Sequence, residues 1–337
     1  MSPRFERCLA DGASAARELR TLRDLLRYAV SRFEAAGLAY GHGTDNARDE
    51  AVALLLWALH LPPDALEPWL DARLTRRERG AAVELIERRI ASRLPAAYLT
   101  GVAWLRGLSF ASDARALVPR SPIAEALDES LPEWLAHHPR PPAWPSSILD
   151  LCTGGGSLAV VAADRFPDAQ VVGADLSGDA LALAEQNRAR HGLQDRIELV
   201  RGDLFAPVRG RRFDLVLCNP PYVNEASMQA LPPEFLAEPR SALAGGVDGM
   251  DLVRRLLQQA PAHLTRDGLL LLEIGHESRH FEAAHPALEF HYLPVAAGDR
   301  MLVLVEAGQL SAAAARSRTP RRGTASSAAR RPRARRP

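Results

Sequence analysis

From residue 148 onward, short apolar runs alternate with helical stretches, and this alternation leaves few folds open to the chain. Helices are predicted between most of the runs, most clearly over Leu158–Phe166 and Asp179–His191. Such alternation is typical of a mostly parallel, doubly wound sheet, so the predicted fold class is α/β. The runs predicted to be strands are Ile148–Cys152, Gln170–Asp175, Ile197–Asp203, Phe213–Cys218, Gly268–Gly275, Leu288–Val295 and Arg300–Glu306.

The last two of these runs are joined by residues 296–299 alone. Because so short a connection cannot hold a crossover helix, the two strands should form an antiparallel hairpin. A seven-stranded sheet with a terminal hairpin differs from the sheet of the NAD-dependent dehydrogenases.

Residues 1–95 are predicted to form a separate helical domain. Leucines at helical spacing predict one helix over Ala16–Gly37, and a second is predicted over Asp45–His60. The capping box Thr75-Arg76-Arg77-Glu78 opens a third helix, which runs to about Arg93.

A β-hairpin is predicted between this helical domain and the sheet, because short apolar segments from residue 98 to 119 are separated by turn residues. A helix over Pro122–His138 follows. We therefore expect a hairpin linker over 96–120 and a sheet domain over 121–308.

The charge of the chain is unevenly distributed. The formal net charge is +1, but nine arginines and no acidic residue follow Glu306. Without these nine, 33 basic residues face 41 acidic ones, so the body carries −8 and the tail +9. An acidic body argues against a protein that grips duplex DNA, whereas the tail could hold a phosphate-rich partner. Residues 309–337 have almost no large apolar side chain and are predicted to be a disordered arginine-rich tail.

The three cysteines, Cys8, Cys152 and Cys218, form neither a CxxC motif nor a metal-ligand pattern. The beginning of the chain lacks the apolar stretch of a signal peptide, and the longest apolar run, Ala51–Leu61, is too short to span a bilayer. We therefore expect a cytoplasmic protein without a disulfide, a metal site or a membrane segment.

A glycine-rich turn, Asp150-Leu151-Cys152-Thr153-Gly154-Gly155-Gly156-Ser157, joins the first predicted strand to the first helix of the sheet. Consecutive glycines let the backbone approach a ligand at the carboxyl end of a strand, where open α/β sheets bind ligands. The next strand ends in Asp175, which is placed to accept hydrogen bonds from both hydroxyls of a ribose. The third ends in Asp203-Leu204, which could meet an adenine amino group and pack on its ring. Together these features predict a nucleoside site.

The fourth strand delivers Asn219-Pro220-Pro221-Tyr222 to the same edge. The two prolines fix φ and remove backbone donors, which leaves a carbonyl without a ladder partner. The amide side-chain oxygen and that carbonyl form a pair of acceptors for the two hydrogens of a substrate –NH2 group. The aromatic ring can stack on a flat amide or base. This tetrapeptide is the predicted catalytic motif.

Two cofactors fit such a nucleoside site, a dinucleotide or S-adenosyl-L-methionine. A pyrophosphate favours the GxGxxG spacing, which Cys-Thr-Gly-Gly-Gly-Ser matches poorly. No histidine or lysine suited to hydride transfer is evident beside the fourth strand. These observations favour the methyl donor.

The motifs at 150–156 and 219–222 together resemble the class I methyltransferases that modify amide or exocyclic nitrogens. The resemblance to one group among them, the protein glutamine N5-methyltransferases, covers about residues 15–307. Gly155 departs from the serine or other small residue usual there, and the arginine tail lies outside the family pattern. The segments that carry this narrower resemblance are Leu231-Pro232-Pro233-Glu234, Glu238-Pro239 and Leu243-Ala244-Gly245-Gly246-Val247-Asp248-Gly249.

One branch of that family modifies peptide-chain release factors and carries an Arg-Pro-x-Thr-Glu segment after the hairpin. This chain instead reads Leu117-Val118-Pro119-Arg120-Ser121-Pro122, which is similar to the branch that acts on the third protein of the large ribosomal subunit. The resemblance implies methyl transfer from S-adenosyl-L-methionine to a glutamine of that ribosomal protein. A release-factor enzyme, an adenine-N6 or guanine-N2 nucleic-acid methyltransferase and a non-catalytic ribosome-assembly module are the alternatives.

Roles for single residues follow from the motifs and the resemblance. Asn219, Pro220, Pro221 and Tyr222 are the predicted catalytic and substrate-binding residues, and the helical domain is expected to dock the protein substrate. Arg120 is predicted to line the substrate entrance, with a salt bridge at the start of a helix as the alternative. The predicted cofactor-binding residues are Asp150, Cys152, Thr153, Gly154, Gly155, Gly156, Asp175, Asp203, Leu204 and Asn219.

Overall fold

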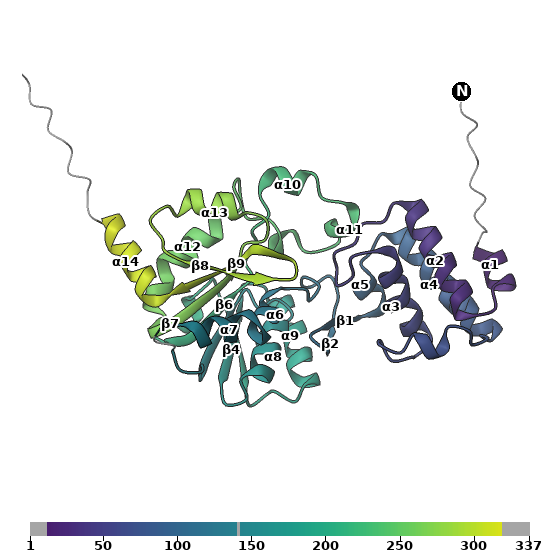
Figure 1. Cartoon of the computed structure of the whole chain (residues 1–337), viewed down its shortest axis with the longest axis horizontal. Coiled ribbons are helices and arrows are strands. Elements are labelled where there is room, and N and C mark those ends of the chain that lie inside the picture. The colour runs from purple at the N-terminus through teal and green to yellow at the C-terminus, as the bar shows by residue number, and fades with distance from the viewer. Residues whose placement is uncertain (1–11, 140–141, 319–337) are drawn as a thin grey trace, which may run out of the picture.

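A computed structural model gives the structure of residues 12–139 and 142–318. The N-terminal helices form one body and the sheet with its covering helices forms another (Figure 1). Within the described ranges, no helix combines the length and the apolar character needed to cross a membrane.

Seven strands form one sheet in the order β5-β4-β3-β6-β7-β9-β8 (Figure 1). Strands β3 to β7 pair in parallel, whereas β9 is antiparallel to both β7 and β8. The predicted doubly wound sheet with a terminal hairpin is therefore confirmed. The strands are β3 (Ser147–Leu151), β4 (Gln170–Asp175), β5 (Ile197–Arg201), β6 (Phe213–Cys218), β7 (Leu264–Glu273), β8 (His291–Val295) and β9 (Gly298–Glu306).

Helices cover both faces of this sheet. Because successive side chains of a strand point to opposite faces, Ile148 joins one apolar cluster and Leu149 the other. Burial on both faces explains why the parallel strands read as almost continuous apolar runs. The helices of this domain are α6 (Ile123–Asp128), α7 (Ser130–His137), α8 (Ser157–Arg165), α9 (Gly178–Arg190), α10 (Glu225–Gln229), α11 (Pro233–Leu236), α12 (Asp251–Gln259), α13 (Ser278–Ala284) and α14 (Ala307–Arg318).

The N-terminal helices share a separate apolar core. The predicted capping box is present, since Thr75 and Glu78 exchange side-chain-to-backbone hydrogen bonds at the start of α4. The single helix predicted over 16–37 is wrong, because Thr21 takes an extended conformation and caps a new helix. The helices of this domain are α1 (Gly12–Glu18), α2 (Leu22–Ala36), α3 (Ala47–Ala58), α4 (Arg76–Ser92) and α5 (Ala96–Thr100).

The predicted hairpin forms between β1 (Val102–Leu105) and β2 (Leu108–Ala111), which pair antiparallel. The single helix predicted over 122–138 is instead the pair α6 and α7, which meet at Glu129. Pro132 explains the break, because it has no N–H to donate to the carbonyl four residues earlier.

The end of the chain also departs from the prediction. The sequence predicts disorder from residue 309, but residues 307–318 form α14, so that expectation is wrong for residues 309–318. The alanines at 312–315 favour a helix, and Leu310 is buried against the sheet domain. The rest of the predicted tail, 319–337, lies outside the described residues.

Candidate functional site

The predicted site residues meet at the carboxyl ends of β3, β4, β5 and β6. In the parallel register, Leu151 lies opposite both Ala174 and Cys218. The glycine turn after β3 is therefore flanked by Asp175 on one side and by Asn219 on the other. This is the edge at which open α/β sheets bind ligands.

The glycine turn depends on left-handed backbone conformations. Gly154 and Gly156 have φ of 54° and 78°, and Cys152 adopts a φ of 59° in spite of its side chain. A Cβ on Gly156 would also lie 3.0 Å from the Cβ of Ala184 in α9. Gly155 contributes differently, because its carbonyl accepts a hydrogen bond from the Asn187 amide at 2.8 Å.

Asp150, near the end of β3, holds the glycine turn in place. Its side chain is fully buried, and its Oδ2 accepts a hydrogen bond of 2.5 Å from the Thr153 hydroxyl. Burial raises the pKa of Asp150 to about 7, and the Thr153 hydrogen bond opposes that rise only in part. The site is therefore built on a carboxyl group whose charged form is disfavoured by burial.

Asp175 joins the first two loops of this edge. Its Oδ2 accepts from the Gly154 N–H at 2.9 Å, and its Oδ1 accepts from the Ser177 N–H at 2.8 Å. Each carboxylate oxygen has a further lone pair, so Asp175 can also accept hydrogen bonds from a ligand. This leaves room for its predicted ribose contact.

Asp203 and Leu204 take different positions after β5. Leu204 is buried in the apolar cluster of the sheet and has a left-handed φ of 48°. The Asp203 carboxylate is about half exposed and forms an ion pair with Arg255 of α12. A contact with an adenine amino group would share this carboxylate with Arg255, and that role stays a prediction.

The Asn219–Tyr222 motif follows β6 directly. Pro220 is buried, whereas the other three residues are partly exposed. Within the described residues, no hydrogen bond holds the Asn219 side chain, and its amide oxygen is therefore available as an acceptor. The hydroxyl group of Tyr222 donates to Glu273 Oε1 at 2.8 Å.

Glu273, at the end of β7, is the buried partner of this tyrosine. Its Oε2 also accepts a hydrogen bond of 2.5 Å from the Ser121 hydroxyl. Burial raises the pKa of Tyr222 well above its usual range, and the Glu273 carboxylate raises it further. The tyrosine therefore stays protonated and acts as a donor that fixes its own ring.

Three glycines support the backbone of this motif. A Cβ on Gly249 would lie 2.1 Å from the carbonyl oxygen of Tyr222, and one on Gly245 would lie 2.7 Å from that of Pro221. A Cβ on Gly275 would lie 2.4 Å from the Tyr222 ring. The segment 243–249, which the sequence linked to the family by resemblance alone, is thus a structural support of the predicted catalytic residues.

Arg120 is salt-bridged, but to Glu238 rather than to a residue of the helix that follows it. Its two terminal nitrogens each donate to a Glu238 oxygen at 2.6 Å. The guanidinium group also lies 5.7 Å from the ring centroid of Phe235. Its predicted contact with the substrate stays a prediction.

The two cysteines of the site are free thiols. Burial raises the pKa of Cys218 well above its usual range, and the neighbouring Cys152 raises it further. A thiol in such surroundings is a poor nucleophile. The predicted contact between Cys152 and the cofactor stays a prediction.

Sequence reasoning missed Asn187 and Glu273, and it named Glu238 only as part of the family resemblance; the partners of all three residues are distant in the sequence. Asn187 is fully buried on α9, and its Oδ1 accepts from the Ala111 N–H at 2.7 Å while its Nδ2 donates to Gly155. It thereby joins the hairpin to the glycine turn. The sequence signal that could have revealed Asn187 is a polar residue on the buried face of the helix predicted over Asp179–His191.

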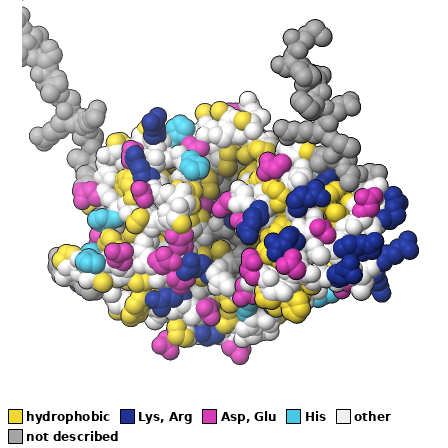
Figure 2. Space-filling view, turned by 45° about the vertical axis from the view of Figure 1, so that its right-hand side comes forward, with side chains coloured by type: hydrophobic (Ala, Val, Ile, Leu, Met, Phe, Trp, Pro, Cys, Tyr) yellow, Lys and Arg dark blue, Asp and Glu magenta, His cyan; other side chains and the backbone are white. Residues whose placement is uncertain are grey.

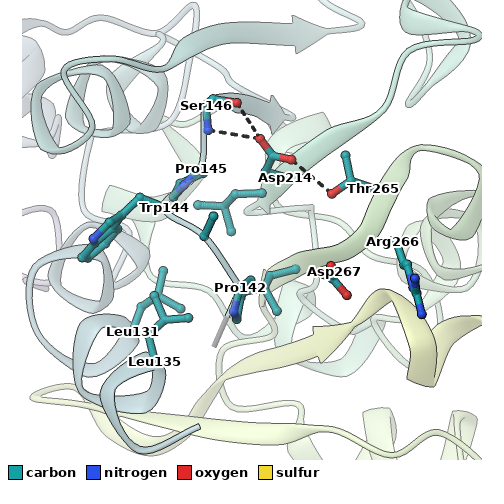
Figure 3. Close-up of a pocket in the computed structure, with 13 residues that line it drawn as sticks. Leu131, Leu135, Pro142, Trp144, Pro145, Ser146, Asp214, Thr265, Arg266 and Asp267 are labelled. Atoms are coloured by element: carbon teal, nitrogen blue, oxygen red, sulfur yellow. Dashed lines mark hydrogen bonds between the residues drawn. The ribbon is translucent and has the colours of Figure 1, made fainter. Parts of the chain in front are cut away.

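A cavity of about 370 Å³ lies at the opposite edge of the sheet (Figure 3). It adjoins Ser146 and Asp214, where β3 and β6 begin, whereas the candidate site lies where those strands end. Asp214 accepts hydrogen bonds from Ser146, Ser147 and Thr265. Its carboxylate therefore holds the strand starts together, and the cavity is separate from the candidate site.

Comparison with known proteins agrees with this geometry. Residues 24–101 match the family model described as the PrmC N-terminal domain, and residues 133–248 match the model described as the methyltransferase small domain.

Three relatives are similar along most of the chain. The ribosomal protein uL3 glutamine methyltransferase of Bordetella pertussis is 56% identical over 294 residues, which cover 87% of this chain and 97% of that protein. The enzymes of the same name from Burkholderia pseudomallei and Neisseria gonorrhoeae are 51% and 47% identical, each over 88% of this chain and 97% of the relative. The predicted family and its cofactor, S-adenosyl-L-methionine, are thereby confirmed. With about half of its residues identical to these proteins across almost their whole length, the chain belongs to the ribosomal protein uL3 glutamine methyltransferase family.

Proposed function

We propose that this chain transfers a methyl group from S-adenosyl-L-methionine to the side-chain amide nitrogen, N5, of a glutamine in ribosomal protein uL3. The observation that carries the proposal is the Asn219 amide, which is not hydrogen-bonded to any described residue and stands beside the glycine turn. Support also comes from relatives named for this reaction, which share about half of their residues with this chain.

The residues of this edge fit a cationic nucleoside. Asp150 and Asp175 supply carboxyl groups, and no arginine or lysine occurs in residues 150–157. This charge distribution suits a sulfonium and disfavours a pyrophosphate. Asp175 would hold the ribose hydroxyls, and Leu204 would pack on the base. When bound, S-adenosyl-L-methionine supplies an electrophilic methyl group.

An amide nitrogen is a weak nucleophile, because its lone pair is delocalised into the carbonyl group. The motif contains no strong base, so the contribution of the protein lies mainly in positioning, which can lower a barrier by about 7–11 kcal/mol. The Asn219 side-chain oxygen and the Pro220 carbonyl would each accept one N–H of the glutamine. They thereby orient the nitrogen and stabilise the positive charge that develops on it.

Pro221 and Tyr222 would form the walls that hold the glutamine amide flat and exclude water. The N–C bond would form as the C–S bond of the donor breaks, which leaves the neutral thioether S-adenosylhomocysteine, and the nitrogen would then release one proton to solvent. Tyr222 is not the base for that proton, because its hydroxyl stays protonated and a neutral phenol is a poor base.

The domain division and the further partners are also proposals. The helical domain over 1–95 would dock uL3, the linker over 96–120 would join it to the sheet domain over 121–308, and the arginine tail would contact ribosomal RNA. We place this reaction in the cytoplasm, as the cysteine usage predicts.

The test is methyl transfer by the wild type and by Asn219→Ala, with mass spectrometry of uL3 peptides. We expect wild type to add one methyl group to one glutamine. The Asn219→Ala variant should lose most turnover, while its affinity for S-adenosylhomocysteine, measured by calorimetry, stays within about twofold, because the acceptor pair mainly serves the substrate nitrogen and the other nine predicted cofactor-binding residues are unchanged.

Asn46→Ala is the matched control, because Asn46 caps α3 in the helical domain, far along the chain from the site. It should lose about 1 kcal/mol of unfolding free energy and keep its turnover. Methylation of a release factor or of bare nucleic acid in place of uL3 would overturn the proposed function.

A further inference from the structure

The segment between the catalytic motif and α12 reaches across to the N-terminal helices. In Figure 1, α11 lies beside the helical domain, whereas α10 lies over the sheet domain. Two buried glutamates, Glu234 and Glu238, are four residues apart in this segment. Both side chains contact residues outside the sheet domain.

Glu238 contacts three parts of the chain at once. Its carboxylate accepts the two hydrogen bonds from Arg120 and a third from the Val118 N–H at 3.0 Å. His42 Nε2, from the loop between α2 and α3, lies 3.4 Å from Glu238 Oε2, with both side chains fully buried. The carboxylate therefore joins the helical domain to the linker and to the segment after the catalytic motif.

Glu234 makes a second connection to the same helical domain. Its Oε1 accepts from the Ala39 N–H at 3.1 Å and lies 2.9 Å from Arg93 Nε. Arg89 Nη1 is 3.7 Å away, and that guanidinium also binds Glu50 inside the helical domain. Between the two glutamates, the Phe235 ring packs 4.2 Å from the His42 ring. We call the contacts of Glu234, Phe235 and Glu238 with these residues the clasp.

The clasp is connected to the catalytic motif by a short stretch of backbone. Val223, the residue after Tyr222, donates its N–H to Leu243 O at 2.8 Å and accepts from the Gly245 N–H at 2.9 Å. Gly245 and Gly249 then pack so closely on this motif that an added Cβ would lie 2.7 Å from the carbonyl oxygen of Pro221 and 2.1 Å from that of Tyr222. A displacement of residues 234–238 would therefore be transmitted through residues 243–249 to the acceptor groups.

Stability alone is a weak explanation for such buried charges. Removing charged groups from water carries a penalty that ion pairing often does not fully offset, and apolar replacements of similar size are often as stable. In Glu238, burial raises the pKa, but the contacts with His42 and Arg120 outweigh it and lower the pKa to about 2. These contacts thus favour the charged form of the carboxylate, and its directional bonds define one geometry.

We propose that Glu234 and Glu238 are positioning residues through which the helical domain sets the geometry of Pro220–Tyr222 for methyl transfer. The inference rests on the proposed function and adds a role to residues that do not contact the reacting atoms. Docking of a protein substrate on the helical domain would then act on the same elements that orient its glutamine.

The first experiment compares Glu238→Gln and Glu234→Gln with wild type, using uL3 as substrate. We expect kcat to fall about 10- to 100-fold in each variant, because small misplacements of reacting groups cost rates of this order. Affinity for S-adenosylhomocysteine should stay within about twofold, since the glycine turn is untouched. Hydrogen exchange of residues 243–249 should become faster.

Glu87→Gln is the matched control. Glu87 forms a two-pronged ion pair with Arg32, at 3.0 and 2.6 Å, between two helices of the helical domain. Its loss should lower the melting temperature but leave kcat and the exchange of residues 243–249 unchanged. An equal loss of kcat in this control would show that any destabilisation of the helical domain lowers kcat, and the inference would be wrong.

A double variant separates positioning from folding. Replacing Arg120 and Glu238 together by leucine removes both charges, so the melting temperature should recover toward that of wild type. We expect kcat to stay low, because the directional contacts are gone. Recovery of kcat along with stability would overturn the inference.

The Glu234→Gln arm excludes a direct effect of Arg120 on the substrate, because the partners of Glu234 all belong to the helical domain. The two proposals also fail differently. If wild type does not methylate uL3, the proposed function is wrong. Normal kcat in both glutamine variants refutes only the positioning role of Glu234 and Glu238.

Discussion

The carboxyl group of Asp150 is fully buried, and this burial governs its protonation. Its folded pKa of about 7 lies above the 3.8 of a free aspartate because burial disfavours the charged form. Because the folded pKa is raised, the contribution of protonated Asp150 to the unfolding free energy is complete below pH 3.8. This contribution is lost as the pH rises through 7. Burial therefore disfavours the charged form of this carboxyl group at the base of the glycine turn.

Asp150→Asn should remove that penalty, because an amide oxygen can still accept the Thr153 hydrogen bond. We expect the variant to match wild type near pH 4 and to be more stable at pH 8, by at most about 4 kcal/mol at 1.36 kcal/mol per pKa unit. Melting temperatures from pH 4 to 8 test this. Asp164→Asn, at an exposed position of α8, is the control and should show no such divergence. Equal stability of Asp150→Asn and wild type at both pH values would contradict the prediction.

The Tyr222 hydroxyl has a separate role from the Tyr222 ring. Tyr222→Phe should lower the unfolding free energy by about 1–3 kcal/mol, because the buried Glu273 carboxylate loses a donor. Turnover should fall less than in Tyr222→Ala, which also removes the wall of the amide pocket. Urea denaturation and initial rates give the two quantities.

Tyr292→Phe provides the comparison, because Tyr292 donates to the more exposed Glu282 at 3.0 Å outside the site. Its loss of stability should be smaller than that of Tyr222→Phe, and its turnover should be normal. A larger stability loss in Tyr292→Phe would mean that burial of the Glu273 pair is not the controlling factor.

At the scale of elements, the strands of the sheet were predictable because their signals are local. The bounds of β4 and β6 match the predicted runs, since the apolar run of β4 ends at Asp175 and that of β6 is followed directly by Asn219. The segment 223–249 carries no periodic pattern, and its function depends on contacts with distant residues. Tyr222 and Glu273, for example, are 51 positions apart. The catalytic motif could therefore be predicted, whereas the support beneath it could not.

The supporting segment yields a prediction at the same scale. Gly249→Ala places a methyl group against the Tyr222 carbonyl, and Gly210→Ala adds one where nothing lies within 4 Å, although both glycines have φ near 80°. Both variants should lose about 1–2 kcal/mol from the left-handed conformation. Only Gly249→Ala should also lose turnover, because it displaces the catalytic motif. Rates and melting curves of the pair decide the matter, and normal turnover in Gly249→Ala would contradict the assigned support role.

At the scale of the whole molecule, charge is divided between its parts. Arginines gather over the helical domain at the right of Figure 2, and the exposed ones include Arg20, Arg73, Arg76 and Arg77. The acidic excess of the body was visible in the composition, but its place in the fold was not. Glu50, Glu234 and Glu238 are buried, so part of that excess never reaches the surface. Composition alone therefore overstates how acidic the surface is.

The arginines beyond α14 yield the last prediction. Residues 319–337 contain seven arginines and no acidic residue, so a chain ending at Arg318 changes from +1 to −6. We expect the truncated chain to fold and to methylate isolated uL3 at the wild-type rate, because the described site lies before residue 319. Its binding to large-subunit particles should weaken and become less dependent on salt. The slope of log affinity against log salt concentration should be smaller by about 0.7–0.9 for each phosphate that the tail no longer neutralises. A full-length variant with the seven arginines changed to glutamine should behave like the truncation, because charge is the cause. If the truncated chain keeps the wild-type salt slope, the tail makes no contact with ribosomal RNA.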